Sequence, residues 1–145
     1  MAQCGKTSRA QHRAVALHDS KVLAVIREGR GLRIRLAAYV HVSVGLPGID
    51  AGTGWAQELD LVLGEASLTA APAEGTLWIS EGQVAIDGTP LRLLPLELRR
   101  AGRVRMELAG AEGRLFAEAA SISIATRGDP EFVEKFAGAA HDRPN

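Results

Sequence analysis

The chain has 145 residues, of which 46% are hydrophobic and 23% are charged. This length is typical of one domain, and the composition is that of a globular protein rather than a disordered one. Seventeen basic and seventeen acidic residues cancel, so the chain lacks the overall positive charge that attracts nucleic acid or anionic membranes. We therefore expect a single globular domain that binds neither nucleic acid nor a membrane.

The first residues show no sign of export. Residues 1–14 contain basic side chains but no apolar run of the length that a signal peptide requires. Cys4 is the single cysteine, so no disulfide can form within the chain. Fourteen of the seventeen basic residues are arginine, which is typical of a GC-rich bacterial genome. We expect a bacterial cytoplasmic protein with a flexible N-terminal segment at 1–14, one β domain at 15–136 and a flexible tail at 137–145.

Two segments near the start of the domain predict a β-hairpin. Residues 21–27 (KVLAVIR) and 32–42 (LRIRLAAYVHV) are rich in apolar and β-branched side chains, and they flank a glycine-containing turn at 28–31. From Leu32 to Leu36, apolar residues alternate with arginines. Because side chains alternate between the two faces of a strand, one face of this hairpin is expected to lie in the core.

Further short strands, separated by turns, are predicted along the rest of the chain. They are expected within residues 55–68, 76–80, 83–86, 91–98, 103–108 and 114–124, after a glycine-rich loop at 45–54. Pro95 predicts that its segment is an edge strand or a bulged one. Glu58 and Asp60 alternate with leucines, so both carboxylates are expected on the exposed face of their strand.

Only the end of the domain is predicted to be helical. Asp129 is a favourable N-cap, Pro130 suits the first helical position, and Gly138 can close the C-terminus. Phe132 and Phe136 would give this helix an apolar side that packs on the sheet. The fold class is therefore predicted to be all-β: an antiparallel β-sandwich or open barrel of about seven to nine strands with one short C-terminal helix.

The turn of the first hairpin also predicts which residues face one another. In either turn type that fits the glycines, the numbers of opposed residues sum to 59. This register places Val25 opposite Ile34, which agrees with one apolar face. Continued outward, it places His18 opposite His41 at one rim of the sheet, on the same face as Tyr39.

This rim is the candidate binding site in the sequence. His18, Tyr39 and His41 would line it, Asp50 in the glycine loop is the nearest carboxylate, and Trp55 would border the same concavity. The simplest interpretation is a polar strand end whose side chains meet water. The alternatives are a metal site and a surface for an organic ligand or partner. Because two histidines without a defined third ligand support a metal only weakly, no metal, cofactor or catalytic residue is predicted.

A local basic cluster follows the segment that contains Pro95 and continues into the strand predicted at 103–108. It contains four arginines flanked by acidic residues, Arg99, Arg100, Arg103 and Arg105. Arg103 and Arg105 occupy the polar side of an alternating strand. Given the neutral total charge, a solvated face is favoured over an anion site.

Four stretches carry a resemblance to known proteins. ALHDSKVLAV, AYVHVS, PGIDAGTGW and DPEFVEKF, which together span residues 15–136, resemble small bacterial β proteins of uncharacterised function. The opening motif His18-Asp19-Ser20 is also similar to that of immunity proteins of bacterial toxin systems. The resemblance implies a β fold and no particular activity.

These observations favour a non-catalytic binding or interaction protein, of which an immunity-type protein would be one version. Exposed edge strands make a homodimer an expectation as well. A first alternative is a small metal- or ligand-dependent β-barrel enzyme that uses His18 and His41 with Asp50. A second alternative is a lipocalin-like carrier, which would need a large apolar cavity.

Overall fold

The computed structural model describes residues 12–43 and 51–136, which form strands and the turns between them. The strands are β1 (His12–Glu28), β2 (Gly31–Ser43), β3 (Gly52–Gly64), β4 (Ser67–Ala70), β5 (Leu77–Trp78), β6 (Glu81–Ile86), β7 (Thr89–Leu91), β8 (Leu93–Pro95), β9 (Arg99–Gly110), β10 (Gly113–Thr126) and β11 (Glu131–Phe136). Within these residues there is no helix of the length and hydrophobicity that a membrane crossing needs. The predicted all-β fold is confirmed.

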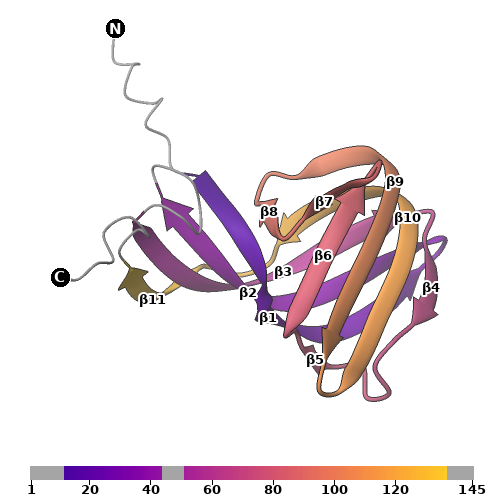
Figure 1. Ribbon diagram of the computed structural model, residues 1–145, viewed down its shortest axis with the longest axis horizontal. Helices are drawn as coiled ribbons and strands as arrows, with labels where there is room; N and C mark the ends of the chain where they lie inside the picture. The colour runs from indigo at the N-terminus through magenta and orange to yellow at the C-terminus, as the bar shows by residue number, and fades with distance from the viewer. Residues whose placement is uncertain (1–11, 44–50, 137–145) are drawn as a thin grey trace, which may run out of the picture.

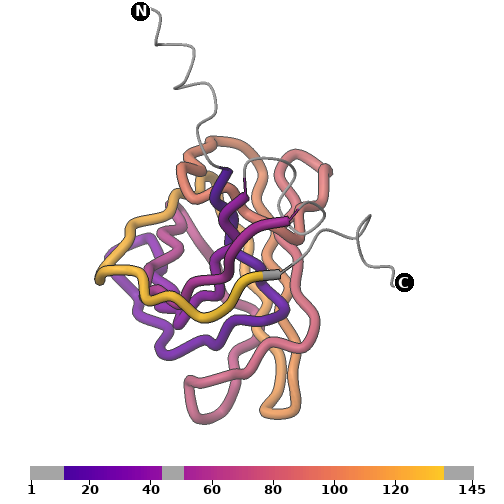
Figure 2. The backbone as a smooth tube through the Cα atoms, turned by 90° about the vertical axis from the view of Figure 1, so that its left-hand side faces the viewer, coloured from indigo at the N-terminus to yellow at the C-terminus, as the bar shows by residue number. Residues whose placement is uncertain are grey.

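The strands form one antiparallel sheet that curls into a half-barrel. Eight strands follow one another in the order β5-β1-β2-β3-β10-β9-β6-β7, as far as the described residues show. Figure 1 shows the curled part on the right, and Figure 2 shows the strands wrapping around a common interior. The other three strands pair with free stretches of longer ones: β11 with β3, β4 with β10, and β8 with β1.

The inner face of the curl holds the hydrophobic core. Leu32, Ile34 and Leu36 of β2 lie opposite three leucines of β3, and all six side chains are buried. Strands β9 and β10 add further buried residues from the facing side of the curl. Each fully buried side chain of this kind contributes about 2 kcal/mol. The alternation in the sequence therefore predicted the core face of these strands, and buried side chains from both sides of the curl belong to one cluster in this interior.

The segment between β5 and β6 ties the two sides of the curl together. The Ile79 amide donates to the Ser20 carbonyl of β1 (3.0 Å), and the Ser80 amide donates to the Ala109 carbonyl of β9 (2.8 Å). At this junction Gly110 lies against the Trp78 backbone so closely that a Cβ on Gly110 would overlap the Trp78 carbonyl oxygen. The glycine is required because only a residue without a side chain allows the two backbones to approach.

The predicted register of the first hairpin is correct near the turn and wrong farther out. Val25 lies opposite Ile34 as expected, but bulges shift the pairing beyond Ala24. His41 consequently lies opposite Ala14 and not opposite His18. One bulge lies between Val22 and Ala24, and the second, between Ala16 and Lys21, contains Ser20, whose hydroxyl donates to the Ala16 carbonyl (2.8 Å) and accepts from the Tyr39 amide (3.0 Å). These two bonds replace strand pairing, so the residues before Ser20 bulge out of the ladder.

The predicted C-terminal helix is wrong, because residues 131–136 form strand β11 along the first part of β3. The chain is guided there by two bonds to β3. The Arg127 amide donates to the Glu58 carbonyl (2.9 Å), and the Gln57 side chain donates to the Gly128 carbonyl (2.7 Å). Pairing with β3 overrides the local capping signals at Asp129 and Pro130. The expected helix end at Gly138 lies outside the described residues.

The start of β1 at His12 precedes the predicted start of the domain at residue 15. Most of the segments expected to be flexible, 1–14 and 137–145, lie outside the described residues.

Candidate functional site

Part of the sheet extends beyond the half-barrel, on the left of Figure 1. We call this part the sheet arm and define it as residues 12–16 of β1, 39–43 of β2, 52–56 of β3, and β11. In its ladder Val40 lies opposite Trp55, and His41 lies opposite Gly54. Because side chains alternate along a strand, the arm has an apolar face with Val40 and Trp55 and a polar face with Tyr39 and His41.

Because of a β-bulge in β11, this last strand places one side chain on each face of the arm. Phe132 pairs with Trp55, but after an extra residue at Val133, Glu134 pairs with Gly54. Without the bulge, Phe132 and Glu134 would share one face. The bulge instead leaves Phe132 on the apolar face and brings Glu134 to the polar face.

Tyr39 is the centre of the polar face. Its hydroxyl donates to the Glu134 carboxylate, which links β2 to β11 across β3. Gly54 lies beneath it, and a Cβ on Gly54 would overlap the Tyr39 hydroxyl. The Tyr39 ring also meets the His41 ring edge-on, with centroids 5.0 Å apart. Burial and the bond to Glu134 raise the pKa of Tyr39 far above its usual value, so this hydroxyl keeps its proton.

His18 and Asp19, in the bulged part of β1, lie near the same face. The two side chains form an exposed contact of 3.3 Å between Nε2 and Oδ2. Burial lowers the pKa of His41, and nearby His18 lowers it further, whereas Asp19 and Glu134 act in the opposite direction. His41 is therefore held in its neutral form near neutral pH, which suits a structural role better than a charged site.

The alternative of a metal site receives no support from the described residues. Within 12–43 and 51–136 no three His, Cys, Asp or Glu side chains are grouped so that they could hold a metal ion. Asp50, the proposed third ligand, lies outside these residues. His18 and His41 influence each other electrostatically but do not face each other across a ladder.

The apolar face contains a hollow of about 220 Å³. It is lined by residues from three strands and two connections, Arg13, Val40, Val42, Thr53, Trp55, Gln57, Leu96 and Pro130. Val40 and Leu96 are almost completely buried and belong to the core. A volume of this size lies below the range of about 300–1,000 Å³ for small-molecule sites and suits a single apolar side chain.

The polar groups around this hollow already have partners inside the protein. Arg13 forms an ion pair with Glu97 (3.1 Å), and the Trp55 indole donates to the Thr53 hydroxyl (2.8 Å). Gln57 is engaged by the Gly128 carbonyl. Each of these polar side chains thus already has a partner within the protein, which favours an apolar group as the occupant of the hollow.

An exposed aromatic side chain stands beside the hollow. Phe132 meets the Trp55 ring edge-on with centroids 5.4 Å apart, yet 55% of Phe132 remains exposed. Its neighbour Val133 is 49% exposed. The described residues contain one other large hydrophobic side chain of similar exposure, Trp78 on β5, and Lys21 lies over its ring. Exposed apolar side chains thus concentrate on β11.

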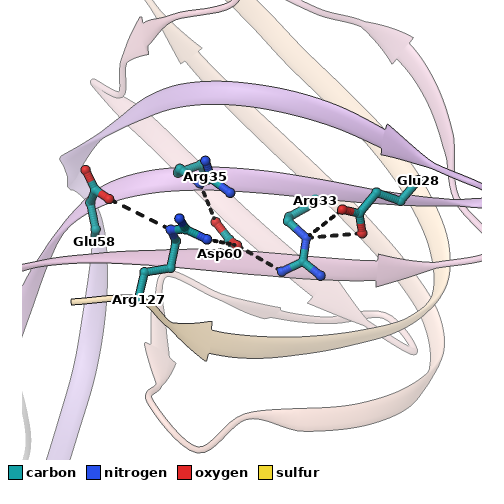
Figure 3. A network of polar contacts seen from close by, with 6 residues as sticks. All are labelled: Glu28, Arg33, Arg35, Glu58, Asp60 and Arg127. Carbon is teal, nitrogen blue, oxygen red and sulfur yellow. Dashed lines mark hydrogen bonds and ion pairs between the residues drawn. The ribbon is translucent and has the colours of Figure 1, made fainter.

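A buried carboxylate holds the chain that leads to β11 (Figure 3). The Asp60 side chain is 0% exposed and accepts from Arg33 (2.9 Å) and Arg35 (3.0 Å), while Arg127 lies 3.6 Å away. Burial alone would raise the pKa of Asp60, but the bonds from Arg35 and Arg33 outweigh it and hold the pKa below its usual value. The expectation of an exposed Asp60 is wrong, because the arginines cover it.

The structure thus separates the residues predicted as one site. His18, Tyr39 and His41 lie together on the polar face, and Trp55 lies on the apolar face. Sequence reasoning missed Glu134 and Phe132, because both were assigned to a helix that does not exist. The alternation of Val40 and Val42 with Tyr39 and His41 was the available signal for a second, apolar face.

Searches for related proteins found no matching family model, no matching curated protein and no matching solved structure. The function therefore has to be inferred from the residues of this chain.

Proposed function

We propose that the protein is a non-catalytic binding protein that docks a partner protein on the apolar face of the sheet arm. The hollow beside Trp55 supports this proposal most directly. Apolar side chains contribute to its lining, and the polar side chains at its edge bond to other groups of the protein. In this proposal one apolar side chain of the partner enters the hollow. An immunity-type protein, which binds a toxin, is one protein of this class.

The side chains around the hollow suit a protein interface. Binding energy in such interfaces concentrates on a few aromatic and apolar anchors near the centre, surrounded by side chains that exclude water. Trp55 and Phe132 supply the aromatic pair, and Val133 extends the apolar surface along β11. The polar face fits a supporting role, because its central hydroxyl is engaged by Glu134 and fastens β11.

Capture of the partner from the native host tests this proposal. Four proteins are compared, the wild type and three variants. Val42→Phe fills the hollow with an apolar ring, and Phe132→Ser removes the exposed aromatic side chain. Trp78→Ser is the matched control, because Trp78 is equally exposed but lies on β5. We expect wild type and Trp78→Ser to retain the partner, and each of the other two variants to bind about tenfold more weakly or less.

Thermal unfolding of each variant shows that a loss of binding does not reflect a loss of fold. A partner retained equally by Val42→Phe and Phe132→Ser would contradict docking on the apolar face. Trp78→Phe then leaves Trp55 as the sole tryptophan, so that its emission should change when the purified partner is added. Unchanged emission at saturation would place the partner elsewhere.

A further inference from the structure

Strand β11, at the lower left of Figure 1, has an outer edge to which no described strand pairs. Backbone N–H and C=O groups along such an edge can pair with a strand of another chain. Four other strands also have a single neighbour, but β4, β5, β7 and β8 are two to four residues long, and β7 and β8 contain proline. Strand β11 has six residues and no proline. Among the described single-neighbour strands it is therefore the best suited to pair with another chain.

The bulge in β11 determines which strand fits this edge. Phe132 and Lys135 both lie on the apolar face of the arm, because they pair with Trp55 and Thr53, which line the hollow. In a strand without a bulge, residues three positions apart point to opposite faces. An unbulged strand on the outer edge of β11 would therefore need a register shift at Val133. A second β11 that runs in the opposite direction carries the same bulge, so the two bulges can coincide and both faces stay in register.

We propose that two copies of this chain form a dimer by antiparallel pairing of their β11 strands, about a two-fold axis perpendicular to the sheet. When the bulges coincide, Phe132 lies opposite Lys135 of the second copy on the apolar face. The exposed ring then meets a lysine that has no ion-pair partner within the described ranges. Sliding the pairing by two residues would instead place Glu131 opposite Glu134 of the second copy, where the like charges repel.

The pairing uses the outer edge of β11, whereas the hollow beside Trp55 is lined by β1, β2, β3 and two connections. The dimer therefore leaves the hollow open. It also forms from the purified chain alone, so it can be tested without the partner protein proposed above, and either proposal can fail while the other holds.

Sedimentation equilibrium of the purified full chain tests the dimer, and we expect a reversible monomer–dimer equilibrium. Phe132→Lys places two ammonium groups opposite each other and should raise the dimer Kd about tenfold or more. Phe132→Glu removes the same ring but faces Lys135 with a carboxylate, and should keep Kd within about threefold of wild type. The double variant Phe132→Lys/Lys135→Glu restores opposite charges and should return Kd to within about threefold of wild type.

Trp78→Lys is the matched control, because Trp78 is similarly exposed but lies on β5, and it should change Kd by less than about twofold. Isotope-filtered nuclear Overhauser spectra of mixed labelled and unlabelled chains should show contacts between the Phe132 ring and Lys135 of another copy. A chain that stays monomeric up to its solubility limit would overturn the dimer. Equal Kd values for Phe132→Lys and Phe132→Glu, or contacts between copies at another surface, would overturn the pairing through β11.

Discussion

Replacing Asp60 with alanine is expected to lower the free energy of unfolding by about 3 kcal/mol. Three arginines converge on this one buried carboxylate, and its removal leaves their charges close together without a counter-ion. Chemical denaturation of wild type and variant measures the difference. The matched control is Glu107→Ala, because Glu107 is 45% exposed in its ion pair with Arg105, and we expect a change below about 1 kcal/mol.

The same comparison predicts a dependence on pH. Because the pKa of Asp60 is lowered in the folded protein, its contribution is fully present above the unfolded pKa of about 3.9. It is lost as the pH falls through the lower folded pKa. The difference in stability between wild type and Asp60→Ala should therefore be constant near neutral pH and shrink below about pH 4. Equal stability of the two proteins at neutral pH would show that the network contributes nothing.

Replacing Gly110 with alanine is expected to cost about 3 kcal/mol. The new Cβ would overlap the Trp78 carbonyl oxygen, and backbone on both sides must move because neither neighbour is a flexible side chain. The segment that joins β1 to β9 should loosen, which amide exchange at Ile79 and Ser80 would detect.

Gly128→Ala is the control for this substitution. A Cβ on Gly128 would meet nothing within 4 Å, so its effect should stay below about 0.5 kcal/mol. A Gly110→Ala protein as stable as the Gly128→Ala protein would mean that the close approach of β9 to Trp78 is absent.

The inner face of the sheet could be predicted from the sequence, because alternation depends only on neighbouring residues. Leu32, Ile34 and Leu36 lie in the core as the pattern indicated. The hairpin register was also correct close to its turn. It failed toward His18, because one bulge lies between Val22 and Ala24 and, at a second, the Ser20 hydroxyl bonds the backbone of both strands. Nothing in the local pattern distinguishes such a serine from a solvent-facing one.

The end of the chain could not be predicted from local signals. Asp129 and Pro130 are favourable at the start of a helix, but β3 offers a free edge along residues 52–56. Pairing there satisfies backbone groups and places Phe132 against Trp55. This competition involves residues far apart in the sequence, so propensity alone favoured the wrong structure.

The burial of Asp60 shows the same limit. Alternation correctly placed it on the outer face of β3, opposite the core. It is nevertheless inaccessible, because arginines of β2 and the later Arg127 lie over it. The sequence pattern reports which face a residue occupies, whereas its exposure depends on side chains that arrive from other segments.

Phe132 can belong to the docking surface beside Trp55 only if residues 131–136 lie as a strand beside β3. Nuclear Overhauser spectroscopy of the full chain tests this directly. We expect contacts between the ring protons of Phe132 and Trp55, whose centroids are 5.4 Å apart, together with cross-strand contacts between Glu131 and Ala56. Helical contacts between residues three positions apart across this segment, without any contact to Trp55, would contradict the strand and remove Phe132 from the docking surface.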